Sequence, residues 1–458
     1  MNPTALPIMS VPATAASGGD APTYAWYRDD PKDWHVVHID ARTFLYVADG
    51  SRIYEVDSET ATQLERLSPR GEAAAQLFLS TLGIRPLHRI SDEAPEQPPL
   101  RSLSLAVAQQ CNLGCTYCYA QQGSFGGAPK PMPLTTALLA VEALFAEVVP
   151  GERVHLAFMG GEPLLNRPVI LAATQYATQL AQRKGATVGF AITTNGTLLT
   201  LADGEFFEQH GFAVTLSLDG VGATHDRQRM FKSGRGSYER ILDNVGPLLS
   251  MQQRMQVSAR VTVTPSNLEL PHTLKALIAL GFHSVGFSPM LASPTGEAQM
   301  DGAALEIMLD QMIACGHEFE RHVVADERFA FANMVTAMKE IHQGTHRPYP
   351  CGAGAGYFGV SADGELFACH RFVDDASGLM GNLKTGVDRQ TQAHWLRQRH
   401  VHRQEPCRSC WARYLCGGGC HHEVIHRGRP ACDYIRGWLH YCLQAYGRLL
   451  ECRPDYFL

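Results

Sequence analysis

The stretch QQCNLGCTYCY at residues 109–119 places three cysteines, Cys111, Cys115 and Cys118, directly after a short apolar run. A cubane iron–sulfur cluster normally takes four thiolates, one for each iron. A compact set of three therefore leaves one iron open to another ligand. Zinc is the alternative, but zinc-binding cysteines usually follow a CxxC spacing with a second pair downstream. The spacing thus predicts an iron–sulfur cluster with one open coordination position.

This CxxxCxxC spacing, with the aromatic Tyr117 before the last cysteine, resembles the motif of the radical SAM superfamily. The resemblance implies that the amino and carboxylate groups of S-adenosylmethionine (SAM) chelate the open iron, with Tyr117 beside the adenine. One electron then splits SAM and yields a 5′-deoxyadenosyl radical, a chemistry that the cofactor supplies and the protein positions.

Composition narrows the remaining possibilities. The 458 residues suffice for two or three domains, and a net charge of −6 with mixed signs gives no reason to expect a nucleic-acid partner. No apolar run approaches the about 20 residues that span a bilayer. No basic residue precedes Arg28, so a secretory signal is not expected. We therefore expect a cytoplasmic protein without a membrane partner, whose 13 cysteines are metal ligands rather than disulfides.

Residues 1–98 are predicted to hold a disordered start (1–21), a small winged-helix-like α+β module and a linker. Strand-like and helix-like segments succeed one another in this module, at 35–39, 43–47, 52–56, 58–67 and 72–82. This order resembles the peptide-binding module related to the peptide chaperone of pyrroloquinoline quinone biosynthesis, which takes a leader peptide as an added strand. An N-terminal cap on the next domain is the alternative.

Residues 99–325 alternate apolar strand-like runs with helix-length segments. The six runs are 103–108, 154–159, 188–193, 213–218, 257–263 and 285–288. Such alternation indicates parallel βα units. The predicted fold class is therefore α/β, a partial (β/α)6 TIM-like barrel of the radical SAM type, with functional residues at the C-terminal ends of the strands.

Several motifs follow these strands in order. Gly160-Gly161-Glu162-Pro163 resembles the GGEP motif that holds the SAM ammonium group in the superfamily. The resemblance also places Asn195, Ser217 and Asp219 along the ribose and carboxylate of SAM, and pairs the guanidinium of Arg229 with the carboxylate. Each motif alone would be a turn signal, but their order after the cysteine motif argues against that interpretation.

The remaining segment, 326–458, is rich in cysteine. Its order of cysteines, including Cys416-Gly-Gly-Gly-Cys420, closely resembles the SPASM domain, which carries two auxiliary clusters. The resemblance implies three [4Fe–4S] clusters in all. The distal one would be held by Cys407, Cys410, Cys416 and Cys432, and the proximal one by Cys351, Cys369 and Cys420. The fourth proximal ligand is left open between Cys442, Cys315, Cys452 and a substrate thiolate.

Polar residues flank these cysteines. Asp374 and Asp375 follow Cys369 closely, and a carboxylate beside a cluster could accept the proton released in an oxidation. A solvated acidic turn is the alternative. His421 and His422 are interpreted as supporting or surface groups, because adjacent side chains point to different sides of a backbone.

The whole pattern is similar to radical SAM/SPASM maturases, which modify a ribosomally made peptide or a small protein and take electrons from a donor such as flavodoxin or ferredoxin. Within this family, residues 111–133 and 416–436 resemble the maturation proteins of quinohemoprotein amine dehydrogenase. We therefore predict thioether crosslinks between cysteine sulfur and Asp or Glu carbon.

Three alternatives remain. The first is a sulfatase maturase, which oxidises Cys or Ser to formylglycine, and the second is a sulfur-to-α-carbon peptide cyclase. Against the first stands His370, because sulfatase maturases place an aspartate directly after the cysteine that matches Cys369. The third alternative, from a different class, is a zinc-binding scaffold that binds a peptide without catalysis.

Overall fold

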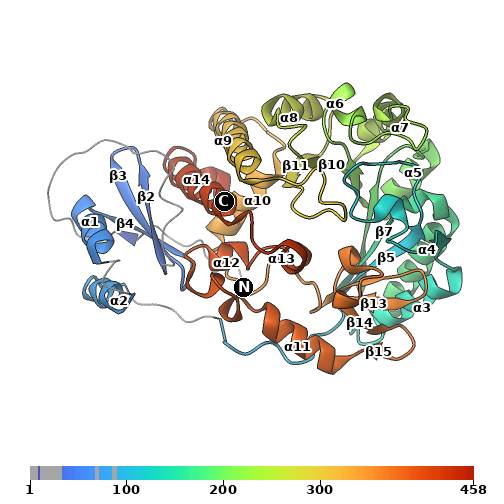
Figure 1. The fold of residues 1–458 in the computed structure, drawn as a ribbon, viewed down its shortest axis with the longest axis horizontal. Helices are drawn as coiled ribbons and strands as arrows, with labels where there is room; N and C mark the ends of the chain where they lie inside the picture. The colour runs from blue at the N-terminus through green and yellow to red at the C-terminus, as the bar shows by residue number, and fades with distance from the viewer. Residues whose placement is uncertain (1–8, 11–32, 68–71, 85–89) are drawn as a thin grey trace.

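The computed structural model describes residues 9–10, 33–67, 72–84 and 90–458. Apart from Met9 and Ser10, the residues predicted to be disordered (1–21) lie outside these ranges. Figure 1 shows three regions in a row, with the C-terminal elements lying between the N-terminal sheet and the barrel.

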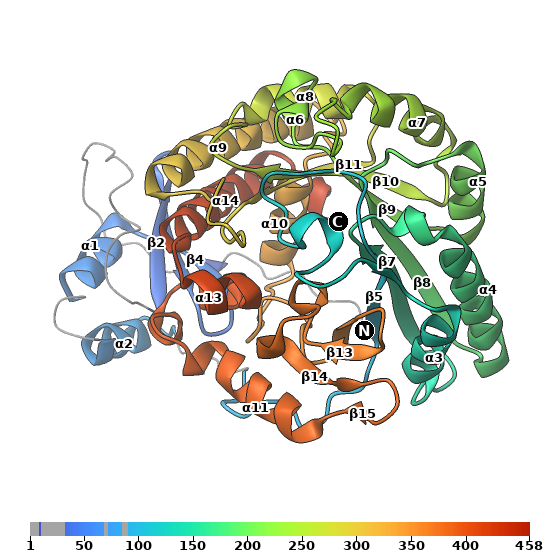
Figure 2. The same cartoon turned by 45° about the vertical axis from the view of Figure 1, so that its right-hand side comes forward.

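Six parallel strands form the barrel wall and pair in the order in which they occur along the chain. They are β5 (Ser102–Gln109), β7 (Arg153–Gly160), β8 (Thr187–Thr194), β9 (Ala213–Ser217), β10 (Gln256–Val263) and β11 (Ser284–Pro289). Helices α3 (Leu134–Phe145), α4 (Arg167–Lys184), α5 (Leu201–His210), α7 (Tyr238–Met251) and α8 (Leu270–Ala279) cover the outside (Figure 2). The predicted partial barrel is confirmed.

The burial of these strands explains their sequences. Seven of the eight residues of β5 are buried, and the strand accordingly is a nearly continuous apolar run, as expected for a strand covered on both faces. In β10 the buried residues alternate with polar ones, because successive side chains point to opposite faces of the sheet. Two short elements, β6 (Lys130–Pro131) and α6 (Ala223–Asp226), lie in loops of the barrel.

The barrel sheet continues into the C-terminal region. Strand β12 (Tyr357–Val360) pairs in parallel with the free side of β5, and β13 (Glu365–Phe367), β14 (Leu379–Asn382) and β15 (Gly386–Val387) follow antiparallel. A Cβ at Gly359 would lie 2.7 Å from the backbone of Cys369 and His370, so glycine allows this close packing. The predicted boundary between residues 325 and 326 stays a prediction, and the sheet itself extends past it.

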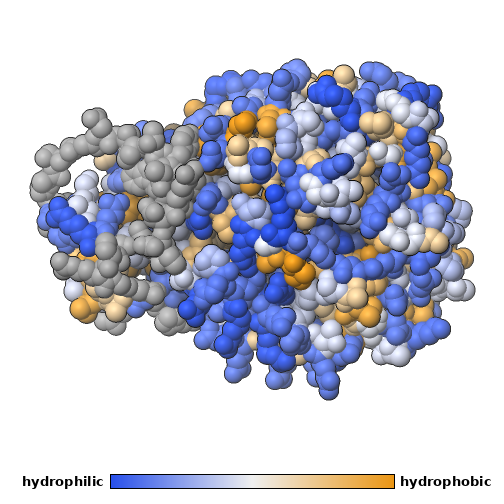
Figure 3. Space-filling model, in the orientation of Figure 1, coloured by the Kyte–Doolittle hydropathy of each residue, from blue (hydrophilic) through white to orange (hydrophobic). Residues whose placement is uncertain are grey.

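Three helices pack together on the open side of the barrel: α9 (Gly302–Val324), α10 (Ala332–His342) and α14 (Cys432–Cys452). The shorter helices α11 (Arg389–Arg399), α12 (Arg413–Cys416) and α13 (His421–Arg427) lie between them and the extended sheet. Figure 3 shows hydrophilic side chains gathered over the region of α11. Within the described ranges, no helix is both long and apolar enough to cross a membrane.

The N-terminal region forms a four-stranded sheet of order β1-β4-β3-β2 with two helices. Its elements are β1 (Met9–Ser10), β2 (Trp34–Ile39), β3 (Arg42–Val47), β4 (Arg52–Val56), α1 (Ser58–Leu67) and α2 (Glu72–Thr81), close to the predicted bounds. Strand β1 pairs in parallel with β4, so the chain itself occupies part of one sheet edge. Peptide binding by this sheet stays a prediction.

Buried polar and aromatic contacts attach this sheet to the C-terminal region. The guanidinium of Arg413 is 4% exposed and forms ion pairs with Asp33 at 2.5 Å and Asp49 at 3.0 Å. The ring of His35 stacks on Trp411 with 3.9 Å between centroids. The sheet is therefore held against the turn that carries several of the C-terminal cysteines.

We predict that Arg413→Ala lowers the free energy of unfolding by about 3 kcal/mol. The substitution removes the guanidinium that pairs with the largely buried carboxylates of Asp33 and Asp49. Urea denaturation followed by tryptophan fluorescence measures this, since Trp34 lies in β2 and Trp411 at the contact. Iron content is checked to exclude loss of a cluster. Arg321→Ala, which removes an exposed pair with Glu318, is the control and should cost less than about 0.5 kcal/mol. Equal effects of the two variants would contradict the prediction.

Candidate functional site

The predicted site residues gather where the barrel strands end. Gly160 and Gly161 finish β7 beside the cysteine loop, and a Cβ on either would lie 2.3 Å from the carbonyl oxygen of Ala108 or Gln110. A Cβ on Gly123 would likewise lie less than 3 Å from the backbone of Gln110 and Gly161. Glycine at these positions therefore lets three backbone segments meet around the start of the cysteine motif.

Cys111, Cys115 and Cys118 are all free thiols of intermediate exposure, and their charges influence one another. Burial raises the pKa of Cys115 to about 12. The Cys111 sulfur accepts hydrogen bonds from the backbone N–H of Leu113 at 3.4 Å and from Asn195 Nδ2 at 3.7 Å. Three clustered thiols with donors aimed at sulfur fit an iron–sulfur cluster, whose assembly would release the thiol protons.

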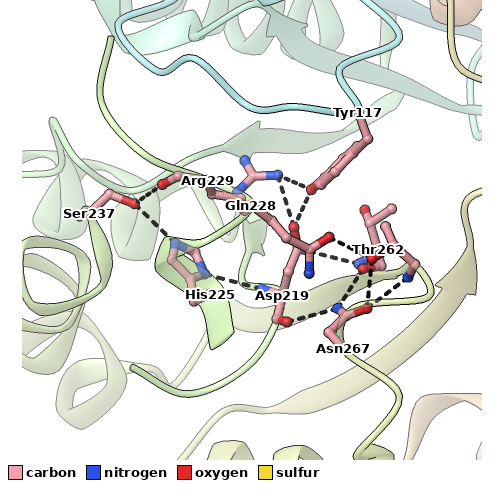
Figure 4. Close-up of polar contacts among 9 residues, drawn as sticks. Tyr117, Asp219, His225, Gln228, Arg229, Ser237, Thr262 and Asn267 are labelled. Atoms are coloured by element: carbon pink, nitrogen blue, oxygen red, sulfur yellow. Dashed lines mark hydrogen bonds and ion pairs between the residues drawn. The ribbon is translucent and has the colours of Figure 1, made fainter. Parts of the chain in front are cut away.

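Tyr117, Asp219 and Arg229 meet beside these cysteines (Figure 4). Arg229 Nη1 donates to the Tyr117 hydroxyl at 2.6 Å and lies 3.6 Å from Asp219 Oδ2, which also contacts that hydroxyl. Arg229 Nε is buried and has no hydrogen-bond partner among the described residues. A buried cationic group with a spare donor fits a carboxylate ligand such as that of SAM.

The Asp219 carboxylate is rigidly placed. It is fully buried, and Oδ1 accepts the backbone N–H of Thr262 at 2.8 Å. Its own backbone N–H donates to His225, and its carbonyl accepts from Asn267. Burial raises the pKa of Asp219, while Arg229 and the hydrogen bonds act against that rise. The network therefore holds a charged pair in place at the mouth of the barrel.

Glu162 is also fully buried, and protein donors surround it. Its carboxylate accepts hydrogen bonds from the backbone N–H of Leu164, the Thr194 hydroxyl and the backbone N–H of Asn195, at 2.7–3.1 Å. Glu162 thereby joins the ends of β7 and β8. Ser217 is the last residue of β9 and is half-buried. The predicted contacts of Glu162, Asn195 and Ser217 with SAM stay predictions.

The C-terminal cysteines form two groups. Cys407, Cys410, Cys416, Cys420 and Cys432 line one cavity of about 70 Å³, beside Arg429 and Arg436. Cys351, Cys369 and Cys420 influence one another electrostatically, and Arg371 Nη1 lies 3.7 Å from Cys420 Sγ. Cys420 thus lies in the cavity of the four cysteines predicted for the distal cluster and also influences Cys351 and Cys369. Which cysteines hold which cluster stays a prediction.

Two of the candidates for a fourth proximal ligand lie elsewhere. Cys315 and Cys442 are fully buried on the packed helices α9 and α14, and burial raises the pKa of both. They behave as small core residues. Cys452 is exposed at the end of α14.

The structure separates the two predicted acidic residues. Asp374 Oδ2 accepts a hydrogen bond from Gln109 Nε2 at 2.6 Å, at the end of β5, whereas Asp375 Oδ2 lies 2.8 Å from His426 Nε2. Asp374 has a φ of 60°, which is unfavourable for a non-glycine residue and is held here by its surroundings. Asp374 therefore lies at the barrel mouth, and Asp375 faces α13.

The sequence analysis did not identify two residues of this region, His370 and Gln109, as site residues. His370 is half-buried, its Nδ1 lies 2.7 Å from the Tyr357 hydroxyl, and its ring centroid lies 6.1 Å from that of Tyr119. Burial lowers the pKa of His370 to about 4. Gln109 is the other residue that the sequence analysis did not single out. Its position two residues before Cys111 could have marked it as a candidate site residue. His421, interpreted as a supporting or surface group, is 3% exposed and packs against Trp395.

Comparison with known proteins agrees with this geometry. Residues 105–277 match the family model of the Radical SAM superfamily. This segment is a radical SAM domain. Its cofactors are SAM and a [4Fe–4S] cluster, and the zinc-scaffold alternative is therefore abandoned.

Relatives extend beyond the radical SAM domain. The serine-type anaerobic sulfatase-maturating enzyme of Klebsiella aerogenes is 25% identical over 365 residues, which cover 75% of this chain and 85% of the relative. The cysteine-type enzyme of Clostridium novyi is 31% identical over 161 residues, 32% of this chain and 40% of its own. The fold is similar to native anSMEcpe with bound AdoMet and Kp18Cys peptide, with a TM-score of 0.63, 19% identity and coverage of 78% and 100%.

These relatives correct the predicted reaction. The expectation of thioether crosslinks, as in the maturation of quinohemoprotein amine dehydrogenase, is wrong, because relatives that match about three quarters of the chain include serine-type anaerobic sulfatase-maturating enzymes. The physical reason is that the motifs behind that expectation resemble cofactor-binding motifs. Cysteine spacings and glycine turns that hold clusters and SAM carry little information about which side chain is oxidised.

We predict that replacing Cys111, Cys115 and Cys118 together by Ala abolishes 5′-deoxyadenosine formation while the iron of the C-terminal cysteines is retained. The reason is that this trio lies at the barrel mouth beside Arg229 and Asp219. Chromatography of the nucleoside products and iron analysis of the anaerobic protein measure both quantities. Undiminished 5′-deoxyadenosine in the triple variant would contradict this assignment.

Proposed function

We propose that this protein is a radical SAM maturase that oxidises a cysteine or serine side chain of a peptide or protein substrate to formylglycine. The observation that carries the proposal is the similarity to a sulfatase-maturating enzyme over 75% of this chain and 85% of the relative. A match of that length extends well beyond residues 105–277, which match the radical SAM family model. A peptide substrate is supported by the similar fold of anSMEcpe, which was solved with a bound peptide.

The chemistry divides between the cofactors and the protein. When bound, SAM and its cluster supply a radical that removes one hydrogen atom from the substrate's β-carbon. The substrate must then lose one proton from its thiol or hydroxyl and one electron, which an auxiliary iron–sulfur cluster at the C-terminal cysteines would accept. A cysteine becomes a thioaldehyde, which water converts to the aldehyde and hydrogen sulfide. The residues of this chain must orient the substrate and accept that proton. The predicted flavodoxin or ferredoxin donor remains part of this proposal.

Asp374 is the proposed proton acceptor. Gln109 is fully buried at the end of β5, its Oε1 accepts the backbone N–H of Ala362 at 2.8 Å, and its Nε2 therefore points to Asp374. The carboxylate is thus held where β5 opens into the cysteine loop. Sulfatase maturases carry an aspartate directly after the cysteine that matches Cys369. In this chain that position is His370, and the carboxylate is proposed to come from Asp374, four residues further along.

The proposed reaction is tested with the Kp18Cys peptide of the solved relative and its serine counterpart. We expect the reduced protein and SAM, without oxygen, to convert either peptide to an aldehyde that reacts with a hydrazide probe. Mass spectrometry should show the loss of two hydrogens together with oxygen in place of sulfur for cysteine, and the loss of two hydrogens alone for serine. A product that keeps its sulfur, loses two hydrogens and carries no aldehyde would overturn the proposal.

We predict that Asp374→Asn lowers the rate of aldehyde formation by about 100-fold, because a general base contributes about that factor. 5′-Deoxyadenosine should still form in the presence of peptide, since hydrogen abstraction precedes proton loss. Asp363→Asn is the matched control, because Asp363 is an exposed carboxylate that pairs with Lys130. If both variants make aldehyde at the wild-type rate, Asp374 is not the acceptor.

A further inference from the structure

A second cluster of ligand-type side chains lies beside the proximal cysteines. One ligand atom from each of Asp375, His422 and His426 lies within 4.8 Å of the other two. The cluster joins the 3₁₀ turn that begins after Asp375 (Ala376–Gly378) to helix α13. These three groups are separate from the thiols and from the Arg229–Asp219 pair described above.

The helix presents its two histidines on one face. Residues 422–426 read His-Glu-Val-Ile-His, and side chains four positions apart in a helix lie above one another. The two imidazole rings have centroids 4.4 Å apart. This HExxH spacing is the one with which a helix offers two imidazoles to a zinc ion. Glu423 is engaged elsewhere, because it forms a 2.7 Å ion pair with Arg371.

His422 has an unused nitrogen. Its Nδ1 is buried and lacks a hydrogen-bond partner among the described residues. Phe372 packs against the ring at 5.0 Å between centroids, so an apolar side chain covers one side of it. A buried polar atom without a partner is uncommon and is explained by an ion or water that completes its interactions.

The carboxylate of Asp375 is fixed before any ligand arrives. Its Oδ1 accepts the backbone N–H of Ser377 at 2.9 Å and the Ser377 hydroxyl at 2.7 Å. Its Oδ2 is the oxygen that meets His426 Nε2 at 2.8 Å. One oxygen therefore orients the carboxylate, and the other faces the histidine pair, as carboxylates bound to metals commonly do.

We propose that Asp375, His422 and His426 bind a divalent zinc-type metal ion. Two imidazoles and a carboxylate are ligands that Zn²⁺ accepts at about 2.0–2.2 Å, which puts ligand atoms about 3.3 Å apart in a tetrahedral site. The His426–Asp375 pair, at 2.8 Å, is slightly closer than that spacing, and small side-chain rotations would bring all three ligand atoms to it. The fourth position is open to water.

The ion has a structural consequence for the cysteine region. Asp375 follows Cys369 by six residues, and His422 follows Cys420 by two, so the metal links the two segments that bring these thiols together. Without it, a hydrogen bond between His426 and Asp375 and the packing of Phe372 hold the segments at this point. The proposed site is thus a metal centre without sulfur ligands, in a region where the other candidate ligands are cysteine thiols.

The test measures zinc on the full-length protein with its clusters in place. The anaerobic holoprotein is incubated with Zn²⁺, passed through a desalting column and analysed for zinc and iron by mass spectrometry. We expect about one retained zinc per chain, with two imidazoles and no sulfur in the zinc X-ray absorption spectrum. Competition with a chromogenic chelator gives the dissociation constant.

His426→Ala and Asp375→Asn should each weaken zinc binding at least about 100-fold and leave iron content unchanged. Both side chains are partly exposed, so folding should tolerate the changes. His322→Ala is the matched control, because His322 Nδ1 meets Glu327 at 2.6 Å in an equivalent histidine–carboxylate pair. This control should keep its zinc. Sulfur in the zinc spectrum, no retained zinc in the wild type, or undiminished binding in either site variant would overturn the proposal.

Discussion

The close approach of two backbone segments determines where the chemistry of this protein is placed. The carbonyl oxygens of Ala108 and Gln110 lie where a side chain on Gly160 or Gly161 would have to be. Any larger residue would push β7 away from the loop that begins at Cys111. Because the ends of parallel strands share one edge of a sheet, this contact also fixes the distance from the cysteines to the residues that follow β8 and β9. Asn195 and Asp219 reach the cysteine loop for this reason.

Gln109, the last residue of β5, connects the barrel to the C-terminal region. Its two amide atoms bind Ala362 and Asp374, which belong to the segment that extends the barrel sheet beyond β5. Since β12 pairs directly with β5, the segment bearing Cys369 is positioned by the same strand that leads into Cys111. One strand thus relates the two cysteine sites, and Gln109 at its end binds the carboxylate of Asp374.

Much of the fold was predictable because it depends on local patterns. The six apolar runs of the barrel and the hairpin around Gly50 follow from hydrophobic periodicity and turn residues, which act over a few positions. The division of the C-terminal cysteines into two cluster-binding sets follows from the resemblance of their spacing and stays a prediction. Contacts between distant segments were not, and Arg413 illustrates this. Its partners Asp33 and Asp49 lie more than 360 residues away, and no local signal marks such a pair.

The sequence by itself determined the parallel barrel and the radical SAM chemistry, because strand periodicity and thiol spacing are local properties. It did not determine the reaction, since its motifs describe cofactors, and the relatives corrected that expectation. The tertiary structure alone decided the roles of two adjacent aspartates. Asp374 turns to Gln109 at the barrel mouth and Asp375 to the histidines of α13. Their separation results from the backbone at Asp374, whose φ of 60° is imposed by the packing around it and is invisible in the sequence.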